Sequence, residues 1–350
     1  MTQFLTRAAL ADVQATGWVH ASSPGVMIGS NVAALDRLTE LSRATLASAG
    51  VDASDRVLVA LTDDGVSAGS LLTRAAVTLG ATASAVSPRG RTRVIRALRS
   101  LRATTLVTTP CGALDLLARI FIEFGLQPED LGLRRILVGG EIPTAGALGQ
   151  LGDEFDCDVG QLLLDPFTGA ALAQGADGFD GVEGDVAARA FLDRDELAAD
   201  GPGPHELVVR TGPDASWLRT GALLASATAP GVLPPIGHTV GDHVLARGRW
   251  LSLPAVDAAL AGIDGVAAWQ LETSREGTLD RVEVVVALDR PTLVDDKMWA
   301  ARISEAVASV VPVRVETRAV GVDDVSMSQP VLDHRGHHVG VDRECAATPS

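Results

Sequence analysis

A short stretch near the start of the chain has residue types suited to holding an anion. Residues 20–29, HASSPGVMIG, begin with the hydroxyl side chains Ser22 and Ser23 and contain Gly25. Glycine permits tight turns in which backbone N–H groups point at a phosphate, and hydroxyls add further donors. The stretch has no lysine, and Pro24 removes one N–H donor. The pattern therefore predicts a loop that resembles a phosphate-binding turn but lacks its charge.

Lysine is scarce along the whole chain. Lys297 is the only lysine among 29 basic residues, and there is no tyrosine. We interpret most surface arginines as the product of a GC-rich coding bias. Lysine and arginine are not interchangeable where chemistry needs a compact ammonium, so a coding bias does not explain the loss of a required lysine.

Composition limits the classes of function. The chain has 350 residues, 47% of them hydrophobic, and a formal net charge of -15. Such an acidic protein repels nucleic acid. No apolar run has the ~20 residues of a membrane helix, and no signal-like leader opens the sequence. Three scattered cysteines, Cys111, Cys157 and Cys345, offer no zinc framework. We expect a cytoplasmic protein with no metal site and with neither a membrane nor a nucleic-acid partner.

Apolar strands alternate with amphipathic helices in the first half of the chain. The alternation predicts a parallel sheet wrapped by helices. We expect Gly125 to end one helix and Thr144 to cap another. The predicted strands are 56–61, 82–86, 104–109, 134–140 and 158–164, and the predicted helices are 68–79, 91–101, 112–125 and 144–155.

The pattern changes after about residue 170. Residues 170–235 read as a β-rich subdomain, and a stretch rich in proline and glycine follows. Strands and two helices then form a compact C-terminal unit. We expect a large domain over residues 1–239 and a small α+β domain over 240–350, with a hinge near Asp242. His334, His337 and His338 fall in what we expect to be a solvated tail.

The order of these pieces resembles the phenylacetate–CoA ligase branch of the adenylate-forming (acyl-CoA synthetase) superfamily. Three short motifs of that branch begin a helix, form a turn and end a strand. They are similar to residues 109–111 (TPC), 125–128 (GLQP) and 140–143 (GEIP) of this chain. The hinge of that branch is similar to residues 236–266. The resemblance implies an α/β adenylate-forming fold. Helix-wrapped sheets and a β-rich subdomain would form the large N-terminal domain, and the small α+β domain would follow.

Members of that superfamily activate a carboxylic acid with ATP and pass the acyl group to CoA. Their phosphate loop reads Ser-Ser-Gly-Thr-Thr-Gly-Lys-Pro, which Ser22 and Ser23 match. The threonines and the lysine are lost, in part to Val26, Met27 and Ile28. The lysine expected in the segment before His338 is also missing. These losses argue against ATP and magnesium as cofactors.

A second family motif, Tyr-Gly-x-Ser/Thr-Glu, falls on residues 165–169. Asp165 replaces the tyrosine that stacks on adenine, and Gly169 replaces the glutamate that holds magnesium. Thr168 keeps the hydroxyl that would contact the α-phosphate. Phe167 is either a pocket residue or a core residue. Asp165, Phe167 and Thr168 are therefore candidates for a pocket with altered chemistry.

Other family positions are retained. Arg219 matches the Arg of an Arg-Thr-Gly-Asp element, although Ala222 replaces its ribose-binding aspartate; a solvated strand position is the alternative for Arg219. Gly139, Gly140 and Glu141 match the framework on the acyl side. The resemblance makes all four candidates for an acyl or nucleotide pocket.

Three functions remain open on these residues. The first is an acyltransferase-like protein that has lost adenylation and passes an activated (aryl)acyl group to a carrier protein or another nucleophile. It would use CoA or carrier-protein pantetheine, with acyl-CoA or acyl carrier protein as partner. The second is a pseudoenzyme scaffold subunit. The third is a divergent AMP-forming acyl ligase. Relatives also make a homodimer an option.

Overall fold

The computed structural model describes residues 4–10, 17–23, 26–61, 68–88, 90–176, 178–179, 184, 186–198, 204–211, 216–225, 232–325 and 329–347, without the side chains of 21–23 and 68. The chain divides into two compact units, Met1–Gly237 and His238–Ser350. Each is described by itself below. No helix in these ranges is long and apolar enough to cross a membrane.

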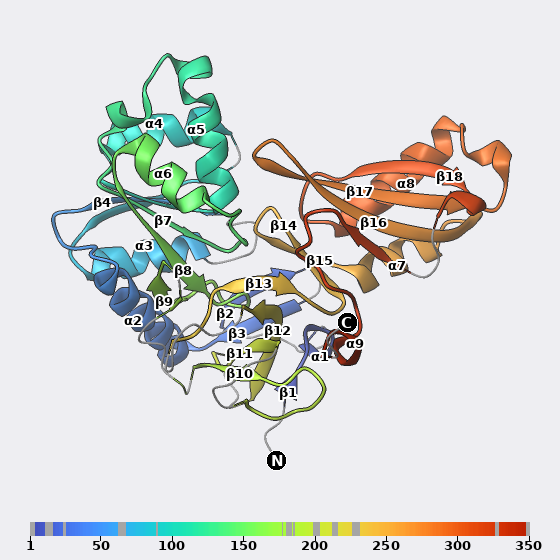
Figure 1. Cartoon of the computed structure of the whole chain (residues 1–350), viewed down its shortest axis with the longest axis horizontal. Helices are drawn as coiled ribbons and strands as arrows, with labels where there is room; N and C mark the ends of the chain where they lie inside the picture. The colour runs from blue at the N-terminus through green and yellow to red at the C-terminus, as the bar shows by residue number, and fades with distance from the viewer. Residues whose placement is uncertain are drawn as a thin grey trace. The chain divides into compact units, whose positions relative to one another are not determined.

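A six-stranded sheet forms the centre of unit 1 (Figure 1). Its strand order is β5-β4-β6-β7-β8-β9, with β9 antiparallel and all other neighbours parallel. This arrangement confirms the predicted parallel sheet. The strands are β4 (Arg56–Ala60), β5 (Thr82–Ala85), β6 (Thr105–Thr108), β7 (Arg135–Gly139), β8 (Asp158–Leu164) and β9 (Ala171–Gly175).

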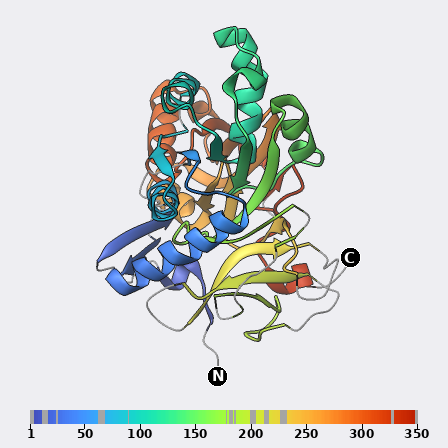
Figure 2. The ribbon, with the colours of Figure 1, turned by 90° about the vertical axis from the view of Figure 1, so that its left-hand side faces the viewer.

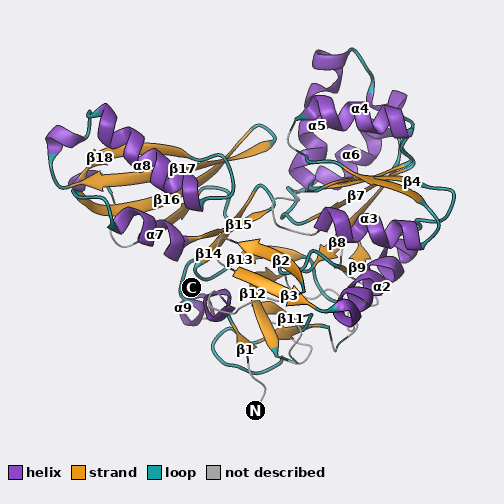
Figure 3. Cartoon of the chain, turned by 180° about the vertical axis from the view of Figure 1, so that it is seen from behind, coloured by secondary structure: helices purple, strands orange, loops and turns teal. Residues whose placement is uncertain are grey.

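Helices cover both faces of this sheet (Figure 3). On one face lie α2 (Val32–Ser48) and α3 (Ala68–Thr78); on the other lie α4 (Arg91–Leu101), α5 (Pro110–Phe124) and α6 (Ala147–Phe155). The short helix η1 (Pro128–Leu131) follows α5.

Strand β4 shows why both faces need a cover. Val57 and Val59 join the core under α2 and α3, whereas Leu58 and Ala60 join the core under α4, α5 and α6. Successive side chains of a strand point to opposite faces, so a continuous apolar run is buried on both sides.

Capping residues set the ends of the helices. Thr109 is the N-cap of α5 and accepts from the Gly112 N–H at 3.0 Å, and Gly125 ends the helix at φ +64°. The prediction for Gly125 is confirmed. The prediction for Thr144 is wrong, because α6 begins after Gly146 with no side-chain cap. Helix α2 was missed, although Asn31 caps it by accepting from the Ala34 N–H at 2.9 Å.

Short strands and a hairpin complete unit 1. A second sheet has the order β1-β12-β11-β10, with β13 paired to β12, and β2 pairs separately with β3. The bounds are β1 (Phe4–Leu5), α1 (Arg7–Leu10), β2 (Trp18–Ser23), β3 (Val26–Ser30), β10 (Ala187–Ala190), β11 (His205–Val209), β12 (Trp217–Leu224) and β13 (Ile236–Thr239).

Unit 2 is a small α+β fold. Its four-stranded sheet has the order β18-β17-β16-β19, and α7 and α8 bury one face of it. The elements are β14 (His243–Ala246), β15 (Arg249–Ser252), α7 (Leu253–Ala261), β16 (Val266–Glu276), β17 (Leu279–Leu288), η2 (Pro291–Leu293), α8 (Lys297–Val310), β18 (Glu316–Gly321), η3 (Val322–Asp324), β19 (Val331–Asp333) and α9 (Arg343–Ala347).

The histidine-containing segment of unit 2 pairs with its sheet, so the prediction of a solvated tail is wrong for His337 and His338, whereas His334 is exposed. Strand β19 pairs in parallel with β16, and His338 forms a bridge with Thr239. Burial lowers the pKa of His338 to about 4. The buried Arg335 holds the segment in place by hydrogen bonds to Asp333 and Asp280.

Candidate functional site

The stretch predicted to be a phosphate loop is a β-hairpin. Strand β2 pairs antiparallel with β3, and Ser23 lies opposite Val26. Only Pro24 and Gly25, which fall outside the described residues, connect the strands. That connection contains one backbone N–H group, because proline has none. The structure therefore places most of the predicted loop in two paired strands, and anion binding at the connection stays a prediction.

The apolar residues of the hairpin follow the alternation of a strand. Val26 and Ile28 are buried, while Met27 is 46% exposed on the opposite face. Val26 and Ile28 are core residues, and Met27 faces solvent. The side chains of Ser22 and Ser23 lie outside the described residues, so their place in a pocket stays a prediction.

His20 joins the hairpin to the second family motif. Its fully buried ring lies with Nε2 3.0 Å from Ser30 Oγ, and the backbone carbonyl of Thr168 accepts a hydrogen bond from the ring. Burial disfavours the charged ring and lowers the pKa of His20 to about 4, although the bond to Thr168 opposes the shift. His20 is therefore neutral at pH 7.

We expect this buried ring to make unit 1 sensitive to acid. The pKa of His20 falls from 6.5 to about 4 on folding, so between those values the unfolded chain binds the extra proton. The contribution of His20 to stability is complete above pH 6.5 and is lost as pH falls through 4, a loss of about 3 kcal/mol. Urea unfolding of unit 1 followed from pH 7.5 to pH 4 measures it.

His20→Gln removes the titrating group and should flatten this pH dependence. The matched control is His338→Gln, because His338 has a similarly low pKa but lies in unit 2. Identical pH profiles for the wild type and His20→Gln in the unit 1 transition would contradict the assignment.

Residues 165–169 form a closed, buried turn. The Asp165 carboxylate accepts from the Phe167 N–H at 3.0 Å and from the hydroxyls of Thr168 and Thr211. Gly169 has φ +75°, and its N–H donates to the Asp165 carbonyl at 2.8 Å. Burial raises the pKa of Asp165, against the hydrogen bonds that favour its charged form. Asp165 thus supports the turn instead of facing a ligand.

Phe167 and Thr168 have no exposed surface. The guanidinium of Arg7 lies 4.6 Å from the centre of the Phe167 ring and donates to the Thr220 carbonyl at 2.6 Å. Phe167 is therefore a core residue held beneath a cation. Every side chain that the sequence placed at the adenine and α-phosphate positions is in contact with protein.

Arg219 lies in the second sheet and is also engaged. It donates to Glu206 at 2.7 Å, to Asp195 at 3.1 Å and to the carbonyl of Arg194 at 2.7 Å. Glu206 is fully buried and also accepts from the Gly221 N–H at 2.7 Å. Arg219 is neither solvated nor directed at a pocket; it balances a buried carboxylate.

The acyl-side candidates lie at the carboxyl end of β7. A Cβ on Gly139 would lie 2.9 Å from the Leu162 carbonyl oxygen, so the strands require glycine there. Gly140 is exposed at φ +81°, and Glu141 is half-buried. Glu141 Oε2 accepts from the Cys111 N–H at 3.0 Å, in the first turn of α5. In open α/β folds, ligands bind at this edge of the sheet.

The predicted hinge residue lies in unit 2. The Asp242 carboxylate lies 2.9 Å from His243 Nδ1, a bond that lowers its pKa, and its carbonyl accepts from the Leu253 N–H at 3.0 Å. The chain passes from unit 1 to unit 2 between Gly237 and His238, four residues before Asp242.

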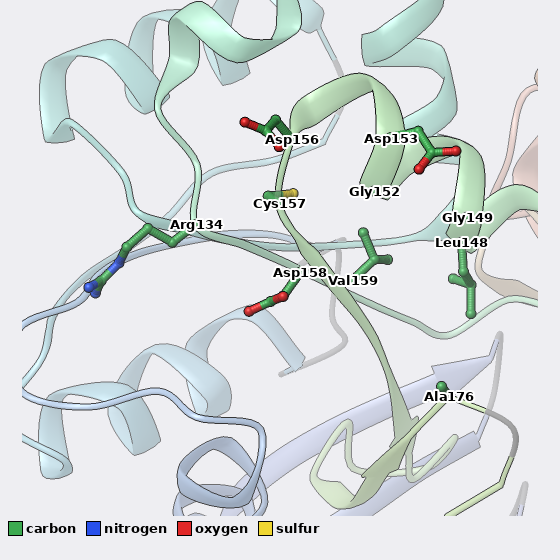
Figure 4. Close-up of a pocket in the computed structure, with 10 residues that line it drawn as sticks. All are labelled: Arg134, Leu148, Gly149, Gly152, Asp153, Asp156, Cys157, Asp158, Val159 and Ala176. Atoms are coloured by element: carbon green, nitrogen blue, oxygen red, sulfur yellow. The ribbon is translucent and has the colours of Figure 1, made fainter.

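A cavity of about 570 Å³ opens at the opposite edge of the sheet (Figure 4). Asp153, Asp156, Asp158 and Arg134 line it, at the start of β7 and β8. Arg134 donates to the buried Asp55 at 2.8 Å. Within the described residues, no three His, Cys, Asp or Glu side chains are grouped so as to hold a metal ion. The cavity shares no residue with the family motifs.

Comparison with solved structures identifies the fold. A 2-hydroxyisobutyryl-CoA ligase in complex with 2-HIB-AMP and CoA matches with a TM-score of 0.76 and 18% identity, over 93% of this chain and 75% of the ligase. The chain has the adenylate-forming fold. No protein-family model and no curated protein matches the sequence.

Other adenylate-forming structures agree. A malonyl-CoA ligase with methylmalonyl-CoA and AMP bound matches with a TM-score of 0.64 and 15% identity, over 86% of this chain and 70% of that one. The amide bond synthetase McbA from Marinactinospora thermotolerans matches with a TM-score of 0.64 and 16% identity, over 85% of this chain and 64% of the synthetase. These likenesses confirm the expected fold class.

Sequence reasoning missed three residues that bond to the closed turn or to one another: His20, Thr211 and Ser30. One signal was available, because Pro24-Gly25 stands between two short runs of strand-forming length, a hairpin pattern. The link from Asp165 to Thr211 spans 46 residues and left no local signal.

Proposed function

We propose that this chain is a degenerate member of the phenylacetate–CoA ligase branch that no longer adenylates carboxylic acids. It binds an acyl group that is already activated and passes it to a carrier protein or another nucleophile. The observation that carries the proposal is the closed turn over residues 165–169. Its polar groups, which the family would direct at a nucleotide, are hydrogen-bonded inside the protein.

The charge requirements of adenylation support this view. The reaction needs donors and cations around the phosphates, and the loss of one such donor costs on the order of 10²–10³ in rate. The hairpin replaces the phosphate loop, and Asp165 adds a carboxylate near it. Lys297 begins α8 of unit 2, outside the C-terminal segment where the family has its lysine. Several contacts with ATP are therefore missing together.

The acyl side differs from the nucleotide side. Gly140 and Glu141 remain partly open to solvent at the carboxyl end of β7, whereas Asp165, Phe167 and Thr168 at the end of β8 are buried. An acyl thioester brings its own leaving group, so its transfer needs no phosphate chemistry at the end of β8. This asymmetry favours acyl transfer from CoA or carrier-protein pantetheine.

Thermal unfolding in the presence of ligands tests the proposal. We expect no shift of the unfolding temperature with ATP and magnesium at millimolar concentration, and no ATP–pyrophosphate exchange. Phenylacetyl-CoA should raise the transition, since a ligand at 100 times its Kd stabilises by about 2.7 kcal/mol. Intact-mass spectrometry of a carrier protein then measures acyl transfer.

The outcomes separate the alternatives. A shift with ATP and magnesium, together with exchange activity, would establish the divergent AMP-forming ligase and overturn the proposal. A scaffold subunit is favoured by the burial of every motif side chain at the end of β8, and it predicts no response to either ligand. Its positive sign would be a ligase or synthase that co-purifies and loses activity without this chain.

A further inference from the structure

Helix α4 carries a row of exposed arginines. Arg93, Arg96 and Arg99 are exposed along one side of the helix, while Val94, Ile95 and Leu98 are buried on the other. We call Arg93, Arg96 and Arg99 the arginine face. In the ranges that the structure describes, none of the three guanidiniums makes a hydrogen bond or an ion pair.

The arginine face does not stabilise the helix that carries it. Helix α4 has no acidic residue in its first turn, where Arg91 and Arg93 lie at the positive end of the helix dipole. Like charges three residues apart also repel each other. Arg91 shows the contrast, because it pairs with Asp115 at 2.9 Å and with Glu123 at 2.7 Å on α5. Arg93, Arg96 and Arg99 have no such carboxylate partner in the described structure, and a bound anionic protein would supply one.

Two large apolar side chains are exposed on α5, the helix that Arg91 contacts. Phe121 and Ile122, at the end of α5, are 60% and 76% exposed. They directly precede Glu123, the partner of Arg91 at the start of α4. Figure 2 shows α5 extending further from the sheet than α6. Large apolar residues beside arginines are typical of protein interfaces.

We propose that the arginine face, together with Phe121 and Ile122, docks an acidic amphipathic helix of a partner protein. Residues three or four apart on a helix have Cβ atoms about 5–6 Å apart, so a row of arginines matches a row of acidic residues on a facing helix. A guanidinium pairs with a carboxylate through two parallel hydrogen bonds. Phe121 and Ile122 would meet the apolar strip of the partner.

The other polyanions fit less well. The net charge of -15 opposes every anionic partner, and it repels an extended polyanion such as nucleic acid or an anionic membrane more than one short helix. A single helix presents only a few carboxylates and meets the arginines at short range. The proposal does not depend on the acyl chemistry proposed above, because none of these five residues belongs to the family motifs.

Fluorescence anisotropy with a designed peptide tests this surface. The probe is a fluorescein-labelled helix of about 18 residues, or five turns, with glutamates on one face and leucines beside them. We expect it to bind the full chain at low salt and to weaken as salt rises. The Arg93→Ala/Arg96→Ala/Arg99→Ala variant should bind about tenfold more weakly.

The control is Arg74→Ala/Arg302→Ala/Arg314→Ala, which changes net charge equally but at exposed arginines elsewhere. It should bind as the wild type does. Phe121→Ser/Ile122→Ser should weaken binding without changing its salt dependence. The proposal is overturned by equal losses in the two triple variants, by equal binding of a glutamine analogue of the peptide, or by failure of the wild type to bind. Binding to phosphatidylserine vesicles in place of the peptide overturns it too.

Discussion

Replacing Arg219 with alanine is expected to destabilise unit 1 by about 3–5 kcal/mol. Glu206 is fully buried and lies 2.7 Å from the Arg219 guanidinium. Removal of that cation takes from the buried carboxylate the guanidinium that it holds at 2.7 Å. The two carbonyl groups that Arg219 also holds, those of Phe191 and Arg194, lose their donor at the same time. Urea unfolding followed by tryptophan fluorescence measures the change.

The control for this variant is Arg302→Ala, because Arg302 is exposed on α8. It should change the free energy of unfolding by less than about 0.5 kcal/mol. Arg219→Met combined with Glu206→Gln removes both charges and should recover much of the loss. If Arg219 instead bound a ligand, Arg219→Ala would unfold like the wild type and lose only ligand binding. That result would restore Arg219 as a pocket residue.

Local periodicity was enough to predict much of the fold. The predicted helix over 91–101 matches α4, and the predicted strand over 158–164 matches β8. The helix is determined by apolar residues on one face and the strand by apolar residues on both faces, and each pattern is visible in the sequence. Gly125 ends its helix because glycine adopts φ +64° without strain. Such signals are local, so they can be recognised without knowing which surfaces the helix or strand packs against.

The site was harder to predict, because its contacts are distant in sequence. The sequence suggested that Arg219 is either a solvated strand residue or a pocket residue. Its partners could not be recognised, because Asp195 and Glu206 lie 24 and 13 residues before it. The sequence suggested that Asp165 is a charge beside a phosphate, because its partner Thr211 lies 46 residues further along the chain. Family alignment assigns a position, but the partners decide whether its side chain faces a ligand or the core.

The residues that align with the nucleotide motifs form one hydrogen-bonded unit. His20 of the hairpin bonds to Ser30 and to the Thr168 backbone, and Thr168 donates to Asp165. Replacing Asp165 with tyrosine would remove the carboxylate that accepts these donors. The change would leave buried polar groups unsatisfied, at about 1–3 kcal/mol each. The hairpin and the closed turn therefore stabilise each other.

The second large effect is expected in unit 2, from Arg335→Ala. Arg335 donates to Asp333 at 2.8 Å, to Asp280 at 2.6 Å and to the Leu245 carbonyl at 3.0 Å. Both carboxylates are nearly without solvent exposure. Loss of the guanidinium should cost about 3–5 kcal/mol and should release the segment that carries β19. Hydrogen exchange of the backbone amides of β19 and of residues 334–340 would detect the release.

The acid dependence of unit 2 should also shift in this variant. In the wild type, burial raises the pKa of Asp333, but the bonds and charge of Arg335 and a bond to Thr273 outweigh it and lower the pKa to about 2. The contribution of Asp333 to stability is complete above pH 3.8, the unfolded value, and is lost only as pH falls through 2. Without the guanidinium the folded pKa moves back toward the unfolded value. Arg335→Ala should therefore lose less stability than the wild type as pH falls from 4 to 2, whereas Arg335→Lys, which keeps a cation, should resemble the wild type. Equal acid dependence of the wild type and Arg335→Ala over that range would show that Arg335 does not hold Asp333 ionised.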